Sequence, residues 1–231
     1  MNQAGTAAAL AALSVVIVAR REAPRLPLLL ADLAAAGPGE VVVVDGGSDD
    51  GTARVAALAG ARVLTATPSR GGQLAAGVAA SGGRWLLLLH ADARLPADWG
   101  SRVARAMNAD PAGVWYFELA IAAPGWPLRL VELAVRLRSR WRQRPYGDQG
   151  LLLGRQRLAA AGGIPPLPLM EDLLLVERLA AQGRLRSLGA ALRVDGRRWR
   201  RLGVWRTTWR NLQLRRAWRR GIPAAELARR Y

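Results

Sequence analysis

The sequence has 231 residues, about half of them apolar, which is enough for one large α/β domain with a sizeable core. It contains no cysteine, which excludes disulfides, thiolate metal sites and a thiol nucleophile, and this fits a reducing cytoplasm. The net charge of +17 lies wholly in residues 126–231, which also hold six of the nine tryptophans, whereas residues 1–125 carry no net charge. We therefore expect the second part of the chain to meet an anionic partner.

Strand and helix patterns alternate through the first part of the chain, after an alanine-rich N-terminus that we expect to be loose. Runs of β-branched residues and leucines predict buried strands at residues 13–19, 41–44, 62–65 and 85–89. Helical patterns lie between them, at residues 24–36, 52–59 and 70–80. This order predicts right-handed crossovers and a Rossmann-like, mostly parallel sheet with helices on both faces.

The regular alternation of strand and helix patterns ends after the fourth strand, and the rest of the chain is predicted to be mainly helical and is basic. Helices are predicted at residues 97–108, 126–144, 172–182, 206–220 and 223–230. Strands are predicted at residues 114–121 and 150–154, with two further short strands within residues 184–194. No repeat or disordered linker separates the two parts.

The stretch Trp85 to Asp92 is the centre of the predicted fold. Four consecutive leucines, residues 86–89, indicate a strand buried on both faces, and His90-Ala91-Asp92 follows at its carboxyl end. Ligands of open α/β sheets bind at that end, and Asp92 is a hard oxygen ligand suited to Mg²⁺ or Mn²⁺. Taken alone, the triplet fits a polar turn equally well.

A second polar turn, Asp45 to Gly51, follows the second strand. A carboxylate placed there can accept hydrogen bonds from a base or ribose, and the helix that follows favours a phosphate. The glycine fingerprint of dinucleotide-binding folds and the lysine-bearing phosphate loop are both missing, which disfavours those classes. The same residues also make a good turn and helix cap.

Two later segments carry further carboxylates. Glu171 and Asp172 lie at a predicted helix start, where a carboxylate can be a general base or can simply complement the helix dipole. Asp148 and Gln149 lie in a polar turn between two apolar elements, which is either a binding loop or only a turn.

Together these segments resemble family 2 glycosyltransferases of the GT-A fold, from about Ser14 to the C-terminus. The resemblance rests on Ser-Val-Val-Ile with Glu22 eight residues on, Val-Val-Asp-Gly-Gly-Ser-x-Asp-Gly-Thr, Leu-His-Ala-Asp and the later Glu-Asp. The further motifs His-Ala-Asp-x-Arg-Leu-Pro, Tyr-Gly-Asp-Gln-Gly, Pro-Leu-Met-Glu-Asp and Arg-Arg-Trp are similar to a short bacterial subgroup, the selenodomain-associated transferase 2 proteins. The resemblance implies a single GT-A domain over residues 1–231, with a nucleotide-sugar-binding half at 1–125 and an acceptor-side half at 126–231.

The resemblance also implies a role for each matching residue. Asp172 matches the catalytic base, and Asp92 matches the metal ligand, with His90 beside it in place of the first aspartate of an Asp-x-Asp motif. The nucleotide-binding positions implied are Glu22, Asp45, Arg70 and Ala91. The acceptor-side positions implied are Asp148, Gln149, Glu171, Arg198 and Trp199.

The family chemistry implied is metal-dependent transfer of a sugar, with inversion, from a nucleotide-sugar donor to a hydroxyl acceptor. A Mn²⁺ or Mg²⁺ ion would neutralise the leaving diphosphate, and Asp172 would take the acceptor proton. The first loop departs from the family pattern Pro-x-x-Asn-Glu, since it reads Val18-Ala-Arg-Arg-Glu22, and Ala75 stands where an asparagine is expected. These changes leave the sugar and the base of the donor open.

Two other interpretations stay open at this point. A sugar-phosphate nucleotidyltransferase would need a glycine-rich, basic loop after the first strand, and Ala19-Arg-Arg-Glu-Ala23 lacks the glycines. A non-catalytic nucleic-acid-binding protein would explain the net charge and the interleaved arginine and tryptophan. It would leave His90-Ala91-Asp92 and Glu171-Asp172 unexplained, so we do not expect nucleic acid as the partner.

The two helices rich in arginine and tryptophan, residues 126–144 and 206–220, suggest peripheral contact with an anionic membrane and a lipid or lipid-linked acceptor. The alternative is that the tryptophans pack on the sheet while the arginines face water. The longest apolar run, residues 7–19, is too short to cross a bilayer and lacks a basic flank. We therefore expect a cytoplasmic protein that contacts the inner face of the plasma membrane peripherally.

Overall fold

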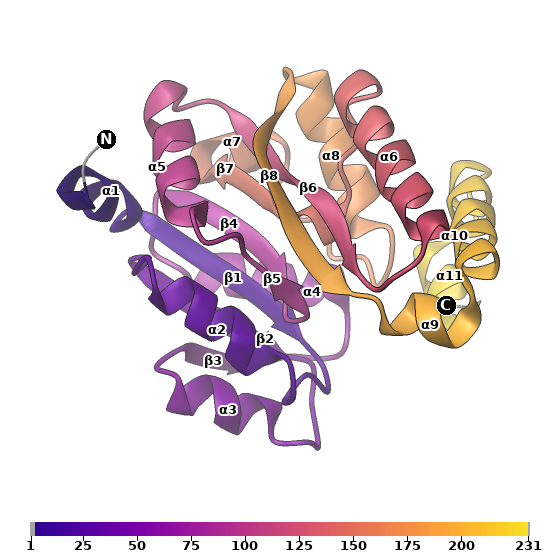
Figure 1. Cartoon of the computed structure of the whole chain (residues 1–231), viewed down its shortest axis with the longest axis horizontal. Coiled ribbons are helices and arrows are strands. Elements are labelled where there is room, and N and C mark those ends of the chain that lie inside the picture. Colours follow the sequence, from indigo (N-terminus) through magenta and orange to yellow (C-terminus); the bar gives the residue numbers. More distant parts are fainter. Residues whose placement is uncertain (1–2, 231) are drawn as a thin grey trace.

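A computed structural model describes residues 3–230, which form an α/β structure around one sheet (Figure 1). Among these residues the sheet has eight strands in the order β3-β2-β1-β4-β7-β6-β8-β5. The strands are β1 (Leu13–Ala19), β2 (Glu40–Asp45), β3 (Arg62–Thr65), β4 (Trp85–His90), β5 (Ala93–Arg94), β6 (Val114–Ala122), β7 (Leu151–Gly154) and β8 (Leu185–Asp195). All run parallel except β7 and β5, so the sheet is mostly parallel, as predicted.

The parallel half of the sheet brings the carboxyl ends of three strands together. Strand β1 lies between β2 and β4, and the register pairs Ala19 with Asp45 and Val18 with His90. The crossover helices α2 (Leu26–Ala34), α3 (Thr52–Leu58) and α4 (Arg70–Ala80) connect these strands. The polar turns that follow β1, β2 and β4 therefore share one edge of the sheet.

The core has one layer on each face of the sheet. The alternation of side chains sends Val15 and Ile17 of β1 toward α2 and α5 (Trp99–Ala109), and sends Val16 and Val18 toward α4 and α8 (Glu171–Ala181). Both sets are buried, because helices cover the sheet from both sides. This explains why the strands read as unbroken apolar runs in the sequence.

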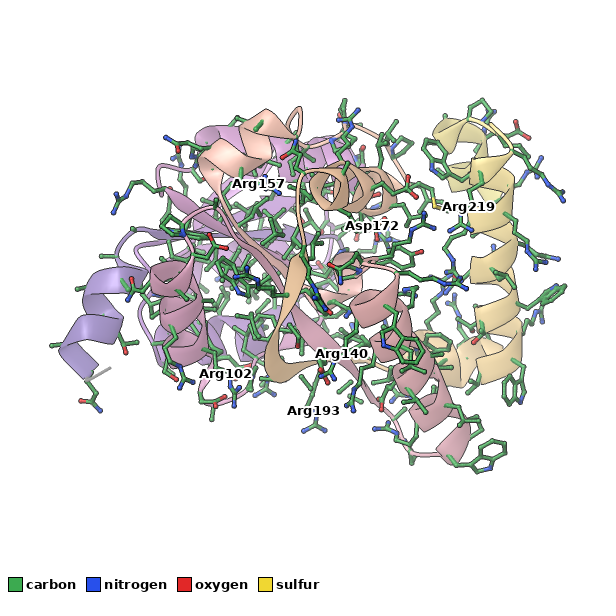
Figure 2. All side chains as sticks on the ribbon, turned by 90° about the horizontal axis from the view of Figure 1, so that it is seen from above. Arg102, Arg140, Arg157, Asp172, Arg193 and Arg219 are labelled. Carbon is green, nitrogen blue, oxygen red and sulfur yellow. The ribbon has the colours of Figure 1, made fainter. Side chains whose placement is uncertain are left out.

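The second half of the chain adds helices at one end of the sheet. Helix α6 (Trp126–Trp141) packs on the ends of β6 and β8, and α10 (Val204–Arg219) and α11 (Ala224–Arg230) pack against the start of α8 through a small cluster around Leu173, Leu214 and Leu227. Figure 2 shows α10 and α11 in yellow, standing beside the sheet at the end where Asp172 lies. No helix within residues 3–230 is both long and apolar enough to span a membrane.

Two sequence predictions about the elements were wrong, and several short elements were not predicted. The N-terminus is not loose, since α1 (Gln3–Leu10) forms from alanine-rich sequence and buries Leu10 in the core with α5. The two short strands expected within residues 184–194 are one strand, β8, whose pairing with β6 shifts register around Gly189. The short elements β5, α7 (Arg155–Ala160) and α9 (Arg197–Leu202) were not predicted from the sequence.

Candidate active site

A buried glutamine holds the ends of β1 and β2 together. The Gln73 side-chain amide, on α4, donates to the carbonyl oxygens of Ala19 at 3.0 Å and Val44 at 2.8 Å. Strands usually splay where their ladder ends, and this amide keeps the two polar turns close. Gln73 was not predicted as a site residue, although it is the only polar side chain of α4 after Arg70.

Asp45 organises the turn after β2. Its buried carboxylate accepts hydrogen bonds from the backbone N–H and the hydroxyl of Ser48. The neighbouring first loop is tied to this turn, because the N–H of Glu22 donates to the Thr52 hydroxyl at 2.9 Å and Arg21 pairs with Asp49. The two loops thus form one platform beside the ends of β1 and β2.

Glu22 joins this platform to the C-terminal part of the chain. Its carboxylate is buried and pairs with Arg197 of α9, at 3.0 Å from one guanidinium nitrogen, and with Arg25. Asp195, at the end of β8, accepts in turn from Arg25 and from the backbone N–H of Arg197. The Glu22 carboxylate is therefore engaged by arginines, and its predicted role beside a nucleotide stays a prediction.

The side chains of His90 and Asp172 meet at Gly147. The N–H of Gly147 donates to Asp172 Oδ2 at 2.8 Å, and a methyl group on Gly147 would lie 3.1 Å from His90 Nε2 and 3.3 Å from Asp172 Oδ2. The second oxygen of Asp172 accepts from the N–H of Leu173 at 2.8 Å. Burial lowers the pKa of His90 to about 4, aided by Arg70 and opposed by Asp172, so the imidazole is neutral at pH 7.

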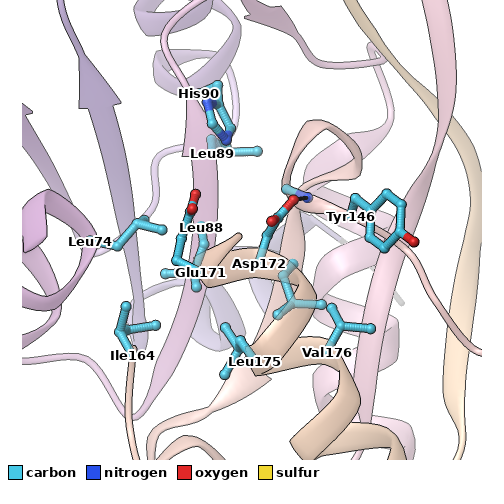
Figure 3. A pocket seen from close by; sticks show the side chains of 12 residues that line it. Leu74, Leu88, Leu89, His90, Tyr146, Ile164, Glu171, Asp172, Leu175 and Val176 are labelled. Carbon is cyan, nitrogen blue, oxygen red and sulfur yellow. Dashed lines mark hydrogen bonds between the residues drawn. The ribbon is translucent and has the colours of Figure 1, made fainter. Parts of the chain in front are cut away.

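Glu171 lies next to His90 and Asp172, in a small apolar cavity. Figure 3 shows its carboxylate and that of Asp172 on the side of the cavity nearest His90. The cavity, of about 30 Å³, is lined by Leu74, Leu88, Ile164 and Leu175 among others, and Glu171 Oε2 is buried without a hydrogen-bond partner. Burial raises the pKa of Glu171 to about 7, and the neighbouring Asp172 adds to the rise.

Two local backbone features place the Glu171-Asp172 pair. Met170 adopts a left-handed conformation, with φ at +67°, which is uncommon for a residue other than glycine, and it turns the chain into α8. Gly71, next to Arg70 in α4, lies very close to the loop that precedes α8. A methyl group on Gly71 would be 2.2 Å from the carbonyl oxygen of Pro165 in that loop. The loop can approach α4 only because this residue has no side chain.

These side chains line one wide cleft of about 1150 Å³ between the sheet edge and α6, α9 and α10. Seven predicted site residues contribute to its walls: Arg70, His90, Asp92, Asp148, Asp172, Arg198 and Trp199. Glu171 faces the small cavity instead, where it adjoins His90 and Asp172. Gln149 does not reach the cleft, because it is wholly buried, donates to the carbonyl of Phe117 and accepts from the hydroxyl of Ser139. Ala91 is also buried, behind Asp92.

The cleft brings opposite charges together along its length. Burial raises the pKa of Asp92, and the charge of Arg197 opposes this rise. Desolvation by the cleft walls raises the pKa of Asp148, and the charge of Arg138 opposes it; the Asp148 side chain is itself open to the cleft. Burial lowers the pKa of Arg198 to about 10, and the nearby Arg70 adds to this effect. Eight arginines and four aspartates line the cleft, so it favours an anionic ligand.

The side chains fit a divalent cation that arrives with a phosphate ligand. Within residues 3–230 no three side chains of His, Cys, Asp or Glu are grouped closely enough to hold a metal by themselves. Asp92 is a hard oxygen donor on the cleft wall, and Mg²⁺ is commonly bound by one or two carboxylates together with substrate phosphates and water. Neutral His90 is the form of imidazole that can coordinate a metal.

Comparison with proteins of known structure shows that this fold is shared. The chain shares its fold with a mycobacterial protein of known structure, at 23% identity and a TM-score of 0.59, covering 84% of this chain and 69% of that one. It also resembles glucosyl-3-phosphoglycerate synthase from Mycobacterium tuberculosis, at 20% identity and a TM-score of 0.57, covering 82% and 75%. For residues 1–349 of TarS from S. aureus the identity is 16% and the TM-score 0.63, over 80% of this chain and 60% of that one.

The sheet topology and the family match together show a glycosyltransferase of the GT-A fold. The family model for glycosyl transferase family 2 matches residues 14–157, and the chain belongs to that family. Family membership favours the transferase interpretation over a nucleotidyltransferase or a non-catalytic nucleic-acid binder. The narrower resemblance to selenodomain-associated proteins stays a prediction.

Proposed function

We propose that the protein transfers a sugar from a nucleoside diphosphate donor to an acceptor nucleophile, with inversion at the anomeric carbon and with help from a divalent cation. The observation that carries this proposal is the cleft itself. Arg70, the first residue of α4, and Asp92, which follows β4, line this cleft together with Asp172 of α8.

On the donor side, the platform formed by the first loop and the Asp45 turn would hold the nucleoside. The buried Asp45 carboxylate can accept a hydrogen bond from the base or the ribose. Arg70, at the N-terminus of α4, suits a phosphate, because helix N-termini and guanidinium groups both favour anions. Asp92, with His90 near it, would hold the cation. When bound, such a cation neutralises charge that develops on the leaving diphosphate.

On the acceptor side, Asp172 would take the proton of the attacking hydroxyl. Two backbone N–H groups, from Gly147 and Leu173, fix its carboxylate at the start of α8. A carboxylate fixed in this way on the cleft wall can align the acceptor for attack from the face opposite the leaving group. Arg198 and Trp199 would contact the acceptor farther along the cleft.

Uridine diphosphate is the first nucleotide to test. Among the structural neighbours, the Mycobacterium tuberculosis synthase was crystallised with Mn²⁺ and UDP-glucose, and TarS was crystallised with UDP. These neighbours are less than 25% identical to this chain, so they suggest the nucleotide for the experiment without assigning it.

The test is a ligand-induced shift in melting temperature with a panel of nucleoside diphosphates, with and without Mn²⁺. We expect one nucleotide to raise the melting temperature only in the presence of metal, since a ligand that binds the folded state alone stabilises it. The shift should be lost in Asp92→Ala and retained in Asp98→Ala, which changes an exposed aspartate on the same segment. A shift that is independent of metal, or that survives in Asp92→Ala, would contradict the assigned role of Asp92.

A further inference from the structure

Helix α6 carries an exposed apolar stripe along its length. Trp126, Leu130, Leu133, Leu137 and Trp141 follow one another at spacings of four, three, four and four residues, which places them on one side of the helix. The opposite side is buried through Leu128, Val135 and Ser139. An amphipathic helix whose buried side is already satisfied does not need this second stripe for packing.

Helix α10 extends this apolar surface. Trp205 and Trp209 are one helical turn apart and both are exposed, and the ring of Trp205 meets that of Trp126 edge-on at 6.4 Å between centroids. Of the eight large apolar side chains most exposed among residues 3–230, six lie on α6 and α10, and these six are between 47% and 78% exposed. We call these six the rim: Trp126, Leu130, Leu133, Trp141, Trp205 and Trp209.

The cleft opens between these two helices and has a mixed lining. Its apolar lining includes Leu130, Leu137 and Trp141 of α6, together with Leu202 and Trp205. We call the end of the cleft at Tyr146 and Asp172 its inner end, because Gly147, which follows Tyr146, donates its N–H to Asp172. The arginines that line the cleft are Arg138, Arg198, Arg201, Arg210 and Arg215, with others.

The arginines indicate an anionic group at the inner end. The pKa of Arg198 falls to about 10, mainly through burial and further through Arg70, Arg210 and Arg201, so these cations are gathered at an electrostatic cost that an anion would offset. Arg138 and Arg215 both lie over the ring of Tyr146, at 3.8 and 5.7 Å, which holds them at this place. A free sugar acceptor would leave the leucines and tryptophans of the cleft lining without an apolar ligand to contact.

We infer that the cleft takes an anionic lipid of a bilayer as its acceptor-side ligand, with its phosphate among the inner arginines, its apolar chain between α6 and α10, and the rim inserted in the headgroup region. Tryptophan suits that region and arginine suits anionic lipid, and residues 126–231 carry the whole net charge of +17. The role of this lipid as acceptor rests on the proposed sugar transfer, whereas its binding does not.

The test measures co-sedimentation of the full chain with vesicles of phosphatidylcholine alone and of phosphatidylcholine with phosphatidylglycerol. We expect binding to the anionic vesicles, falling about tenfold in Leu130→Asp and in Trp141→Asp, as expected when an apolar contact worth about 1.4 kcal/mol is lost. Equal binding to both vesicle types, or to neither, would overturn the inference.

The chain supplies matched controls. Leu28 on α2 and Leu58 on α3 are 49% and 79% exposed, close to Leu130 and Trp141, and lie on other helices. Leu28→Asp and Leu58→Asp change the net charge equally and should change vesicle binding less than twofold. If all four variants lose binding equally, attraction follows net charge and the proposed surface is wrong. A dimer that Leu130→Asp dissociates in light scattering would assign the rim to a second copy of the chain and also overturn it.

Two further experiments identify the ligand and separate this inference from the proposed function. Dihexanoyl phosphatidic acid should raise the melting temperature in the native protein and not in Leu130→Asp, whereas glycerol phosphate should do no more than inorganic phosphate. Equal shifts from the lipid and glycerol phosphate would mean that the cleft binds phosphate without a chain. Leu133→Asp, which changes a rim residue outside the cleft lining, should lose vesicle binding and keep the metal-dependent nucleotide shift. If that shift is absent in every variant while lipid binding follows the expected pattern, the proposed transfer fails and the lipid site stands.

Discussion

Asp172 is the residue on which the proposed chemistry depends most directly. The N–H groups of Gly147 and Leu173 fix its carboxylate beside His90 on the cleft wall, so its removal should affect the reaction and not the fold. We expect Asp172→Asn to lower the transfer rate by about 10² to 10⁴, the usual contribution of a general base. Product formation with saturating donor would measure this, with the metal-dependent nucleotide shift retained.

The control for this prediction is Glu177→Gln, on the same helix but paired with Arg144 at the surface. It removes a carboxylate charge from α8 while leaving the cleft wall unchanged. If both variants slow the reaction alike, the effect belongs to the charge of the helix, and the assignment of Asp172 as the base is wrong.

Glu171 gives the site a pH-dependent contribution to stability. The folded state raises its pKa from 4.5 to about 7, so it favours the protonated carboxyl. The stabilisation is complete below pH 4.5 and is lost as pH rises toward 7, by about 3 kcal/mol at most. His90 acts with the opposite sign, because its pKa falls from 6.5 to about 4 and its contribution is lost as pH falls between these values.

Glu171→Gln separates these two contributions. The glutamine cannot ionise, so we expect the difference in unfolding free energy between this variant and the native protein to grow in favour of the variant from pH 4.5 to pH 7 and then to level off. Urea denaturation at intervals of half a pH unit would measure it. A difference that stays constant with pH would show that Glu171 ionises normally in the folded state.

At the scale of single residues, sequence could predict what lies at the ends of regular elements. His90, Asp92 and Asp172 could be placed near one edge of the sheet because a buried strand or a helix start fixes where such residues lie, and all three line the cleft. Gln149 was misplaced, since a glutamine in a polar turn reads the same whether it faces a cleft or, as here, fills a buried position. The left-handed backbone of Met170 has no sequence signal, because it depends on the packing of its side chain with α10 and α11.

At the scale of elements, the loop before α8 packs directly on α4, which fixes where Asp172 lies relative to Arg70. A methyl group on Gly71 would lie 2.2 to 2.7 Å from backbone atoms of Pro165 and Leu167, and the N–H of Gly71 donates to Leu167 at 3.0 Å. We expect Gly71→Ala to lower the unfolding free energy by about 2 kcal/mol, because backbone cannot move aside as a flexible side chain can.

Chemical denaturation would measure this change, with Gly82→Ala as the control. Gly82 has an ordinary φ and no atom within 4 Å of an added methyl group, so that substitution should be close to neutral. If Gly71→Ala is equally neutral, the loop has room to move and does not fix the site.

Most elements could be predicted because their patterns are local. The buried strands and the helices between them are bounded by glycine, proline and capping residues, and their ends were found within a few residues. Strand β8 was predicted as two strands because Gly189, which has a positive φ, interrupts the pattern, whereas pairing with β6 on both sides of the irregularity keeps it one strand. Helix α9 was missed because its arginines are ordered by distant carboxylates and not by an apolar face.

At the scale of the whole molecule, ion pairs join parts of the chain that are far apart in sequence. Glu22 and Arg197 are 175 positions apart, and their pairing connects the loop beside the ends of β1 and β2 to the helix that begins the far wall of the cleft. Sequence could assign Glu22 to the first loop but could not show that an arginine from α9 meets it. Residues 1–125 and 126–230 already share the sheet, since β7 pairs with β4 and β8 with β6, and the Glu22–Arg197 pair adds a contact between them at the edge of the cleft.

Arg197→Met tests whether this connection stabilises the molecule. Glu22 is buried and would keep only Arg25, so we expect a loss of about 1 to 3 kcal/mol in unfolding free energy, less than for a wholly buried pair because the Arg197 side chain is 40% exposed. Arg21→Met, which removes an arginine that is 66% exposed from its pair with Asp49, should cost less than about 1 kcal/mol. The double variant Glu22→Gln with Arg197→Met should recover part of the loss, since it leaves no buried charge unpaired. Strictly additive losses would mean that the two side chains do not stabilise each other, and that α9 is held to the platform by Asp195 and apolar contacts alone.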